Sequence, residues 1–203
     1  MLALSYCSTI NAGIIFSNEI TGLAPENFNP FMDGQFVDAH AVVSGIGRGS
    51  GIAGTSGQDR YNARSWSTSS TIDLNDCFRF TIAPQAGFEM DYSDFIYTGQ
   101  RSTSGPTTFS FRTSVASSAT INLSSALFQN VTAPIEFRLY GYGASLASGT
   151  FSINDFSFNG AVSQISAIPE PPSAALGVLA MTAGLWHSRL RRLPLSTTTS
   201  AGE

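Results

Sequence analysis

The chain has 203 residues, of which 42% are hydrophobic and only 12% charged, and its formal net charge is −4. All ten basic residues are arginine, and the part before Pro169 holds seven of them against twelve acidic residues, a net charge of −5. Scattered arginines in an acidic body argue against a nucleic-acid-binding protein, because phosphates demand a basic patch. The length is typical of one domain with one hydrophobic core.

The composition favours β-strands joined by tight turns. The chain contains 15 Phe and 19 Gly and is rich in Ser and Thr, whereas long surface helices would need more Glu, Lys and Ala. The two cysteines, Cys7 and Cys77, are too few for a disulfide framework. Cys77 is expected to be buried rather than reactive.

Residues 1–12 are interpreted as the remnant of a signal peptide in a truncated gene model. Met1 to Tyr6 resembles part of an apolar signal segment, and small residues follow it. A basic stretch is missing and the apolar run is short, so the alternative is that this segment forms the first strand of the domain.

Residues 13–167 are predicted to form an exported β-sandwich domain, because apolar and polar residues alternate in many short segments. Segments rich in Gly, Pro and Asn separate them and are expected to be loops, above all residues 17–35, 45–57 and 98–106. The expected strands comprise residues 14–16, 36–43, 76–82, 88–97, 107–114, 119–123, 135–140 and 150–162.

Two of these strands show the pattern in detail. Between residues 135 and 140 the odd positions are apolar and expected to point inward, whereas Glu136, Arg138 and Tyr140 are expected to point outward. In the last strand the apolar parity changes between Ile153 and Phe156, which predicts a β-bulge at Asn154-Asp155. Many short strands with close turns predict an all-β, jelly-roll-like β-sandwich.

A glycine-rich stretch, Gly49-Ser50-Gly51-Ile52-Ala53-Gly54, matches the dinucleotide-binding fingerprint by letters, and Asp73 lies at about the expected distance. That motif functions only between a strand and a helix that opens on its last glycine. Thr55-Ser56-Gly57-Gln58 follows instead, so we do not predict nucleotide binding.

No catalytic residues are predicted. His40 is the one histidine outside the C-terminal segment, and no serine lies in a nucleophile elbow beside which it could act. Glu89, Asp91 and Asp94 form the single acidic cluster, and paired carboxylates are what glycosidases use. Acids so close along one strand more often solvate an edge, so the protein is expected not to be an enzyme.

Cofactors are not predicted either. Jelly-roll carbohydrate-binding modules often hold a structural calcium ion near their last strand, and Asn154-Asp155 would be the corresponding place in this chain. Turn chemistry explains this pair more simply. Exposed aromatic faces with polar tips stack against sugars, which makes Trp66, Tyr140 and Tyr142 candidates for carbohydrate contact. The competing interpretation for each is core or cross-strand packing.

The C-terminal part combines three unlike features. A stiff Pro169-Glu170-Pro171 motif is followed by the uncharged, apolar residues 174–186, which predict a short transmembrane helix. The run is shorter than the about 20 residues that a membrane core requires. Flanking arginines can extend the span and predict a cytoplasmic end, and these are Arg189, Arg191 and Arg192. The alternative is an ordinary buried helix.

The order of these features resembles the PEP-CTERM sorting signal of exported bacterial proteins. The resemblance implies that an exosortase-type membrane enzyme recognises Pro169, Glu170 and Pro171 and processes the protein. It also implies residence in the inner membrane before processing, and later release or attachment at the surface of a cell that makes exopolysaccharide. The signal is assigned to residues 168–193, and residues 194–203 are expected to form a disordered tail.

The function predicted from these observations is that of a non-catalytic exported surface or extracellular-matrix protein, associated with exopolysaccharide. Its predicted partners are the sorting enzyme, the membrane and the polysaccharide, but not nucleic acid. The alternatives are an exported glycan-active hydrolase and a simple membrane-tethered binding domain.

Overall fold

The computed structural model describes residues 13–22, 24–114 and 121–166, and these residues fold almost entirely as β-structure. The elements are β1 (Gly13–Glu19), β2 (Gln35–Val37), β3 (Ala41–Arg48), β4 (Ala53–Gly54), β5 (Tyr61–Arg64), β6 (Cys77–Pro84), β7 (Phe88–Arg101), β8 (Thr108–Thr113), the 3-10 turn η1 (Ala126–Phe128), β9 (Ile135–Tyr142) and β10 (Phe151–Gln164).

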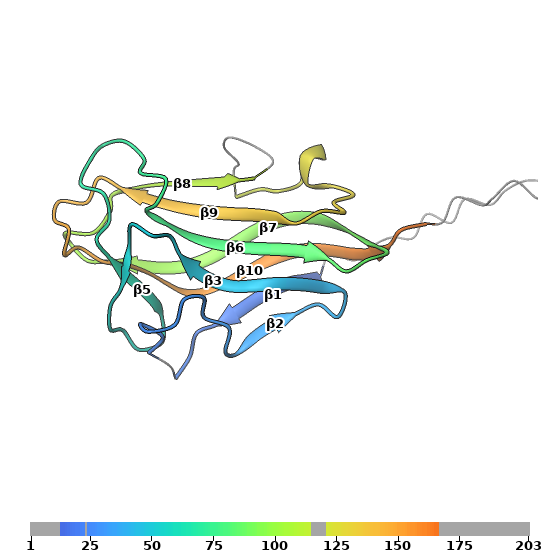
Figure 1. Ribbon diagram of the computed structural model, residues 1–203, viewed down its shortest axis with the longest axis horizontal. Coiled ribbons are helices and arrows are strands. Elements are labelled where there is room, and N and C mark those ends of the chain that lie inside the picture. The colour runs from blue at the N-terminus through green and yellow to red at the C-terminus, as the bar shows by residue number, and fades with distance from the viewer. Residues whose placement is uncertain (1–12, 23, 115–120, 167–203) are drawn as a thin grey trace, which may run out of the picture. The chain divides into compact units, whose positions relative to one another are not determined.

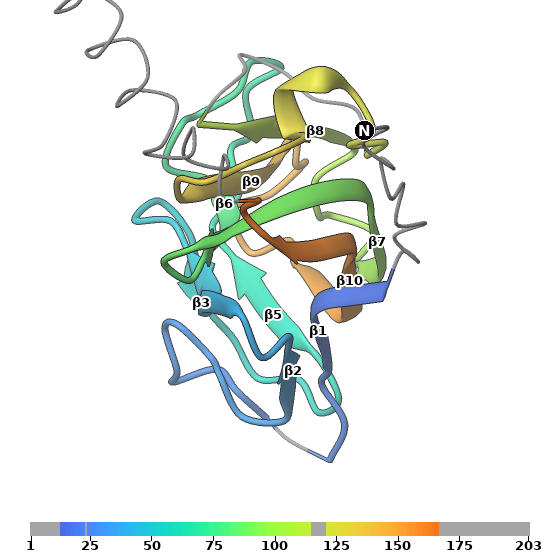
Figure 2. The ribbon, with the colours of Figure 1, turned by 90° about the vertical axis from the view of Figure 1, so that its right-hand side faces the viewer.

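The strands form two antiparallel sheets, as expected for a β-sandwich. The four-stranded sheet has the order β3-β6-β9-β8, and the six-stranded sheet has the order β2-β1-β10-β5-β4, with β7 paired to the other edge of β10. Figure 1 looks onto the four-stranded sheet, with β7, β10 and β1 behind it. Figure 2 shows the two sheets edge-on, on opposite sides of the core.

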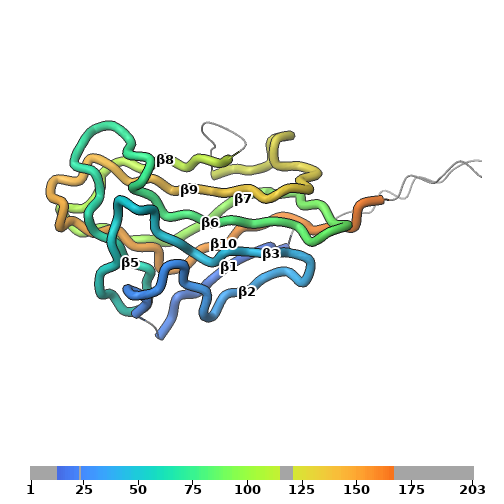
Figure 3. Tube along the Cα trace, in the orientation of Figure 1, coloured from blue at the N-terminus to red at the C-terminus, as the bar shows by residue number. Residues whose placement is uncertain are grey.

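β10 is the central strand of the six-stranded sheet. One of its edges pairs with β5 through Phe151–Ile153 and with β1 through Asp155–Gly160. Its other edge pairs with β7 over the whole strand. The end of the described chain therefore lies between strands from the beginning and the middle of the sequence, as the trace in Figure 3 shows.

The bulge predicted in this strand is confirmed. The pairing of β10 with β7 shifts register between Ile153 and Asp155, so Asn154 is the extra residue. The shift turns both Ile153 and Phe156 into the core, where they are 0% and 3% exposed. A regular strand would have placed one of them in solvent.

Aromatic rings from both sheets fill the core. Phe158 of β10 lies at its centre, with ring centroids 4.4 Å from Phe95 of β7, 4.8 Å from Phe137 of β9 and 5.3 Å from Phe80 of β6. Such edge and offset contacts add to the free energy gained by burial of the rings. The apolar faces predicted for residues 76–82 and 135–140 thus lie side by side in one sheet and pack on β7 and β10 of the other sheet.

The prediction of a single strand over residues 36–43 is wrong. A turn divides the segment into β2 and β3, because the Asp38 carboxylate accepts a hydrogen bond from the His40 backbone N–H at 2.8 Å. The Ala41 N–H then donates to the Asp38 carbonyl at 3.0 Å and closes the turn.

The loop predicted over residues 45–57 is also partly wrong, because β3 continues to Arg48 and β4 follows. The pairing of β3 with β6 shifts between Val43 and Ile46, and Gly45 there has a φ of +78°. A Cβ atom at Gly45 would lie 2.4 Å from the Phe31 carbonyl oxygen. Glycine is therefore required inside this strand, where its presence alone suggested a loop.

The outer edge of β7 is covered by the segment that follows residue 120. The Phe95 N–H donates to the Ile121 carbonyl at 2.9 Å, and Met90 and Val131 pair as an isolated bridge. Residues 121–123, which the sequence predicts as part of a strand, therefore protect an edge instead of forming a strand of their own. β7 itself extends to Arg101, into the predicted loop 98–106.

Within the described ranges, no helix has the length and apolar character needed to cross a membrane. The predicted signal-peptide remnant 1–12, transmembrane helix 174–186, sorting signal 168–193 and tail 194–203 all lie outside the described residues.

Candidate functional site

Two of the three aromatic residues predicted to contact carbohydrate are buried. Trp66 is 1% exposed, its indole N–H donates to the Ala63 carbonyl at 3.0 Å, and its ring packs on the edge of Phe78. Tyr140 is 2% exposed, and its hydroxyl accepts a hydrogen bond from Arg138 at 3.3 Å. Neither ring can stack on a sugar from solvent, so for these two residues the packing interpretation replaces the predicted contact.

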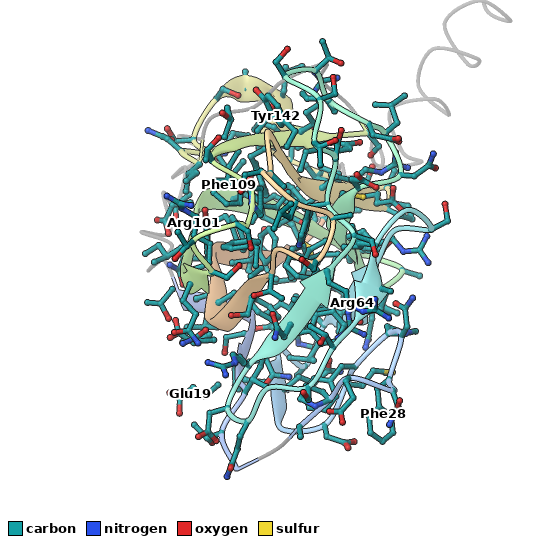
Figure 4. All side chains as sticks on the ribbon, turned by 90° about the vertical axis from the view of Figure 1, so that its left-hand side faces the viewer. Glu19, Phe28, Arg64, Arg101, Phe109 and Tyr142 are labelled. Carbon is teal, nitrogen blue, oxygen red and sulfur yellow. The ribbon has the colours of Figure 1, made fainter. Side chains whose placement is uncertain are left out.

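Tyr142, the third of these aromatic residues, is half-buried at the end of β9. Figure 4 shows it at the opposite side of the view from Glu19. Tyr142 thus lies away from the groove in which Glu19 takes part, described below.

In the acidic cluster of β7, Asp91 and Asp94 accept hydrogen bonds that connect parts of the fold. Asp94 accepts a hydrogen bond from the side-chain amide of Asn159 at 2.6 Å, and Asp91 accepts one from the backbone N–H of Asn130 at 2.6 Å. These contacts tie β7 to β10 and to the loop before β9. His40 stacks on Phe88 of β7 at 3.9 Å between ring centroids, so its ring packs over the same end of the strand.

The bulge at Asn154-Asp155 and the glycine-rich stretch have structural roles too. The Thr98 hydroxyl donates to the Asp155 carboxylate, and no group of three His, Cys, Asp or Glu residues in the described chain could hold a metal ion. The Gly49 and Gly51 N–H groups donate to the carbonyls of Cys77 and Asn75 at 2.8 and 3.1 Å. The two-residue strand β4 follows instead of a helix.

An open groove of about 550 Å³ lies over β1 and β10 in the six-stranded sheet. Ile14 and Ile96 line it with side chains that are 48% and 56% exposed. Three carboxylates, those of Glu19, Asp59 and Asp155, also line it. Their charges give this groove an acidic character.

The outer face of the four-stranded sheet carries a row of three arginines. Arg79 of β6 lies directly opposite Arg138 of β9, and Arg138 lies directly opposite Arg112 of β8. Directly opposed residues on adjacent strands are about 5 Å apart. We call this set the arginine row.

The arginines of the row differ in the contacts that they make. Arg138 forms an ion pair with Glu136, which is the one salt bridge found among the described residues, and it also contacts the Tyr140 hydroxyl. These hydrogen bonds, to Tyr140 and to Glu136, raise the pKa of Arg138. The Arg112 guanidinium lies 5.6 Å from the centroid of the Tyr140 ring. Tyr140 is thus the buried support of two members of the row.

A second groove, of about 300 Å³, begins at the arginine row. Arg79 and Arg138 line it together with residues of the neighbouring loops, among them Ser50, Leu74 and Asn75. The Ser50 hydroxyl donates to the Asn75 side-chain oxygen at 3.1 Å. Cys77 also lines this groove and is a free, buried cysteine, in agreement with the sequence prediction.

Arg48 forms the inner wall of this groove and is 3% exposed. Its guanidinium donates to the carbonyls of Asn62 at 2.8 Å and Phe28 at 3.0 Å, and it lies 3.7 Å from the centre of the Tyr61 ring. Burial lowers the pKa of Arg48, although these partners keep a positive charge favourable. Arg48 therefore fixes the loop before Pro30 against β5 and holds the wall in place.

The arginine row could not be recognised in the sequence. Alternation indicated that Arg138 points outward, but strand order and register bring it beside Arg79 and Arg112, and both depend on contacts between distant segments. A search for arginines at outward positions of separate strands would have suggested these residues, though not their adjacency.

Comparison with known proteins gives no family model, no curated protein and no solved structure that matches this chain.

Proposed function

We propose that this protein is a non-catalytic, exported surface or extracellular-matrix protein, sorted by an exosortase-type membrane enzyme and associated with exopolysaccharide. The sorting part of the proposal rests on the order of the Pro169-Glu170-Pro171 motif, the apolar residues 174–186 and the arginine cluster. In this proposal residues 174–186 form the temporary membrane anchor.

The association with polysaccharide is supported by one structural observation. The outer faces of both sheets carry open grooves, of about 550 and 300 Å³, lined by carboxylate, hydroxyl, amide and guanidinium groups. Open grooves that combine polar and apolar groups suit an extended, hydroxyl-rich polymer, which binds through many hydrogen bonds and through the carbon faces of its sugars. We also propose the finer, jelly-roll-like description, because successive strands β6 to β10 pass from one sheet to the other and back.

The sorting proposal is tested by intact-mass analysis of the mature protein from its own host. The expected product ends near Pro169 to Pro172 and lacks residues 174–203. Glu170→Ala is expected to block this processing without changing the fold. Recovery of an unprocessed C-terminus from the membrane fraction, unchanged by Glu170→Ala, would contradict sorting.

The non-catalytic part is tested with a panel of polysaccharides and esters. We expect no turnover. Turnover that is lost in Glu89→Gln or Asp94→Asn would support a glycan hydrolase instead and would overturn this part of the proposal.

A further inference from the structure

We infer that the arginine row is a binding site for the oxyanion groups, carboxylate or sulfate, of an acidic polysaccharide. The inference rests on the proposed function, since it names the class of polymer and the residues that bind it. Guanidinium groups suit this chemistry because their planar donors match the two oxygens of a carboxylate or sulfate.

The row has the geometry to follow a polymer. Arg79, Arg138 and Arg112 occupy consecutive positions across β6, β9 and β8, on one face of the sheet. With neighbouring strands about 4.8 Å apart, the three backbone positions span about 10 Å. A chain with repeated anionic groups that crosses the strands can therefore contact more than one guanidinium.

The charge of the row contrasts with the rest of the domain. Three of the seven arginines before Pro169 are in the row, and among the described residues one carboxylate, that of Glu136, forms an ion pair with them. The strands of the six-stranded sheet instead hold two arginines, Arg64 and Arg101, against five acidic residues: Glu19, Glu89, Asp91, Asp94 and Asp155. An acidic polymer is therefore attracted to one face and repelled by the other.

The arginine side chains already contact the protein before any ligand binds. Arg112 rests near the Tyr140 ring, and its Nε–H is buried without a hydrogen-bond partner in the described part of the chain. Arg79 extends over Gly47, where an added Cβ atom would lie 3.2 Å from its Cγ and Nε atoms. Gly47 thus leaves the space that this side chain uses. Side chains ordered in advance lose less entropy on binding.

The groove beside the row can hold the uncharged parts of a sugar. Ser50 and Asn75 provide a hydroxyl and an amide next to Arg79 and Arg138. Leu74 is 59% exposed at the same groove and provides apolar contact for the carbon face of a ring. The site thus combines the three kinds of contact that an acidic sugar needs.

Binding of the full chain to three probes tests this inference: polygalacturonate, dextran sulfate and neutral dextran. We expect binding to at least one anionic probe, weakened by added salt, and at least tenfold weaker binding to dextran. The two anionic probes distinguish carboxylate from sulfate recognition. Arg79→Gln combined with Arg112→Gln is expected to weaken binding about tenfold, at about threefold for each exposed charge pair.

The matched control combines Arg64→Gln with Arg101→Gln. Both residues are exposed, belong to strands of the six-stranded sheet and are labelled in Figure 4, so the control removes the same charge from another surface. It is expected to bind within twofold of the unchanged chain. Arg79→Lys, which keeps the charge but not the planar donors, is expected to retain part of the affinity.

Three outcomes would overturn the inference. They are equal loss of affinity in the control pair, equal binding of dextran and the anionic probes, or tighter binding of a single-stranded oligonucleotide than of either anionic polysaccharide. Equal binding of dextran would leave the proposed polysaccharide association intact. Failure of sorting appears separately in the intact-mass analysis, so the two proposals can fail independently.

Discussion

Arg79 of β6 and Arg138 of β9 occupy directly opposite positions in the four-stranded sheet, although like charges at such positions repel each other. Glu136 neutralises part of this charge through its ion pair with Arg138. Placing Arg79 opposite Arg138 is expected to lower the stability of the fold, but it concentrates positive charge on one face. This combination is expected where an arginine serves binding and not folding.

Replacing Arg79 by Thr is therefore expected to raise the free energy of unfolding, by about 0.5 kcal/mol at low ionic strength. Urea denaturation measures this change, and the gain should shrink in 1 M salt because screening weakens the repulsion, with a Debye length of about 3 Å. Arg64→Thr in β5 is the control for the intrinsic strand preference of Thr. An equal gain in the control would contradict the explanation by charge.

Phe158→Ala is expected to cost about 3 to 5 kcal/mol in the free energy of unfolding, because it removes the ring at the centre of the aromatic core. Phe158 is 0% exposed and contacts rings from both sheets. Thermal or urea denaturation measures the loss. Ile96→Ala, at a position 56% exposed on the outer face, should change stability by no more than about 0.5 kcal/mol.

Arg48→Met is expected to cost about 3 kcal/mol or more, because it leaves the carbonyls of Asn62, Phe28, Glu26 and Pro25 without their donor. Arg48→Lys should restore little of this loss, since one ammonium group cannot reach all the carbonyls that surround the edge of the planar guanidinium. Urea denaturation of both variants provides the test. Full stability of the lysine variant would show that the charge alone is sufficient.

The Cys77 thiol is expected to resist alkylation in the folded protein. Burial raises its pKa from 9.0 to about 11, so very little thiolate is present at pH 8. Labelling with iodoacetamide in a Cys7→Ser background, with and without urea, measures the protection. Rapid labelling without urea would contradict the burial of Cys77.

The same pKa shift predicts a dependence of stability on pH. The folded state holds the thiol proton more tightly than the unfolded state, so this contribution is fully present below pH 9 and is lost as pH rises to about 11. Tyr61, whose pKa burial raises to about 12, extends the loss to higher pH. Cys77→Ala should remove the part of the pH dependence between 9 and 11.

Local patterns of the sequence were sufficient for much of the fold. The change of parity between Ile153 and Phe156 identified the bulge, because both side chains had to reach the same core. The division between β2 and β3 was missed, because the Asp38 turn lies inside a segment that reads as continuous. The second half of β3 was missed because Gly45 and Gly47 suggest a loop when their neighbours Phe31 and Arg79 are unknown.

The candidate site depends on information that no single segment contains. Trp66 and Tyr140 are residue types that are common in sugar-binding surfaces. Both are buried here, because segments distant in sequence pack on them. The arginine row requires the register of β6, β9 and β8, which are separated by up to several tens of residues in sequence. The alternation of residues could therefore give the outward direction of Arg138 but not its proximity to Arg79 and Arg112.

The central position of β10 also determines when the domain can fold. β1 and β7 hydrogen-bond to Phe151–Gln164, the last strand of the described chain, so neither has its main partner until that segment is present. A chain that emerges N-terminus first, from a ribosome or a translocation pore, can therefore pair β1 with β2 and β4 with β5, but it cannot join these pairs to β7 until β10 has emerged. The six-stranded sheet can thus form completely only after all of its described strands have emerged.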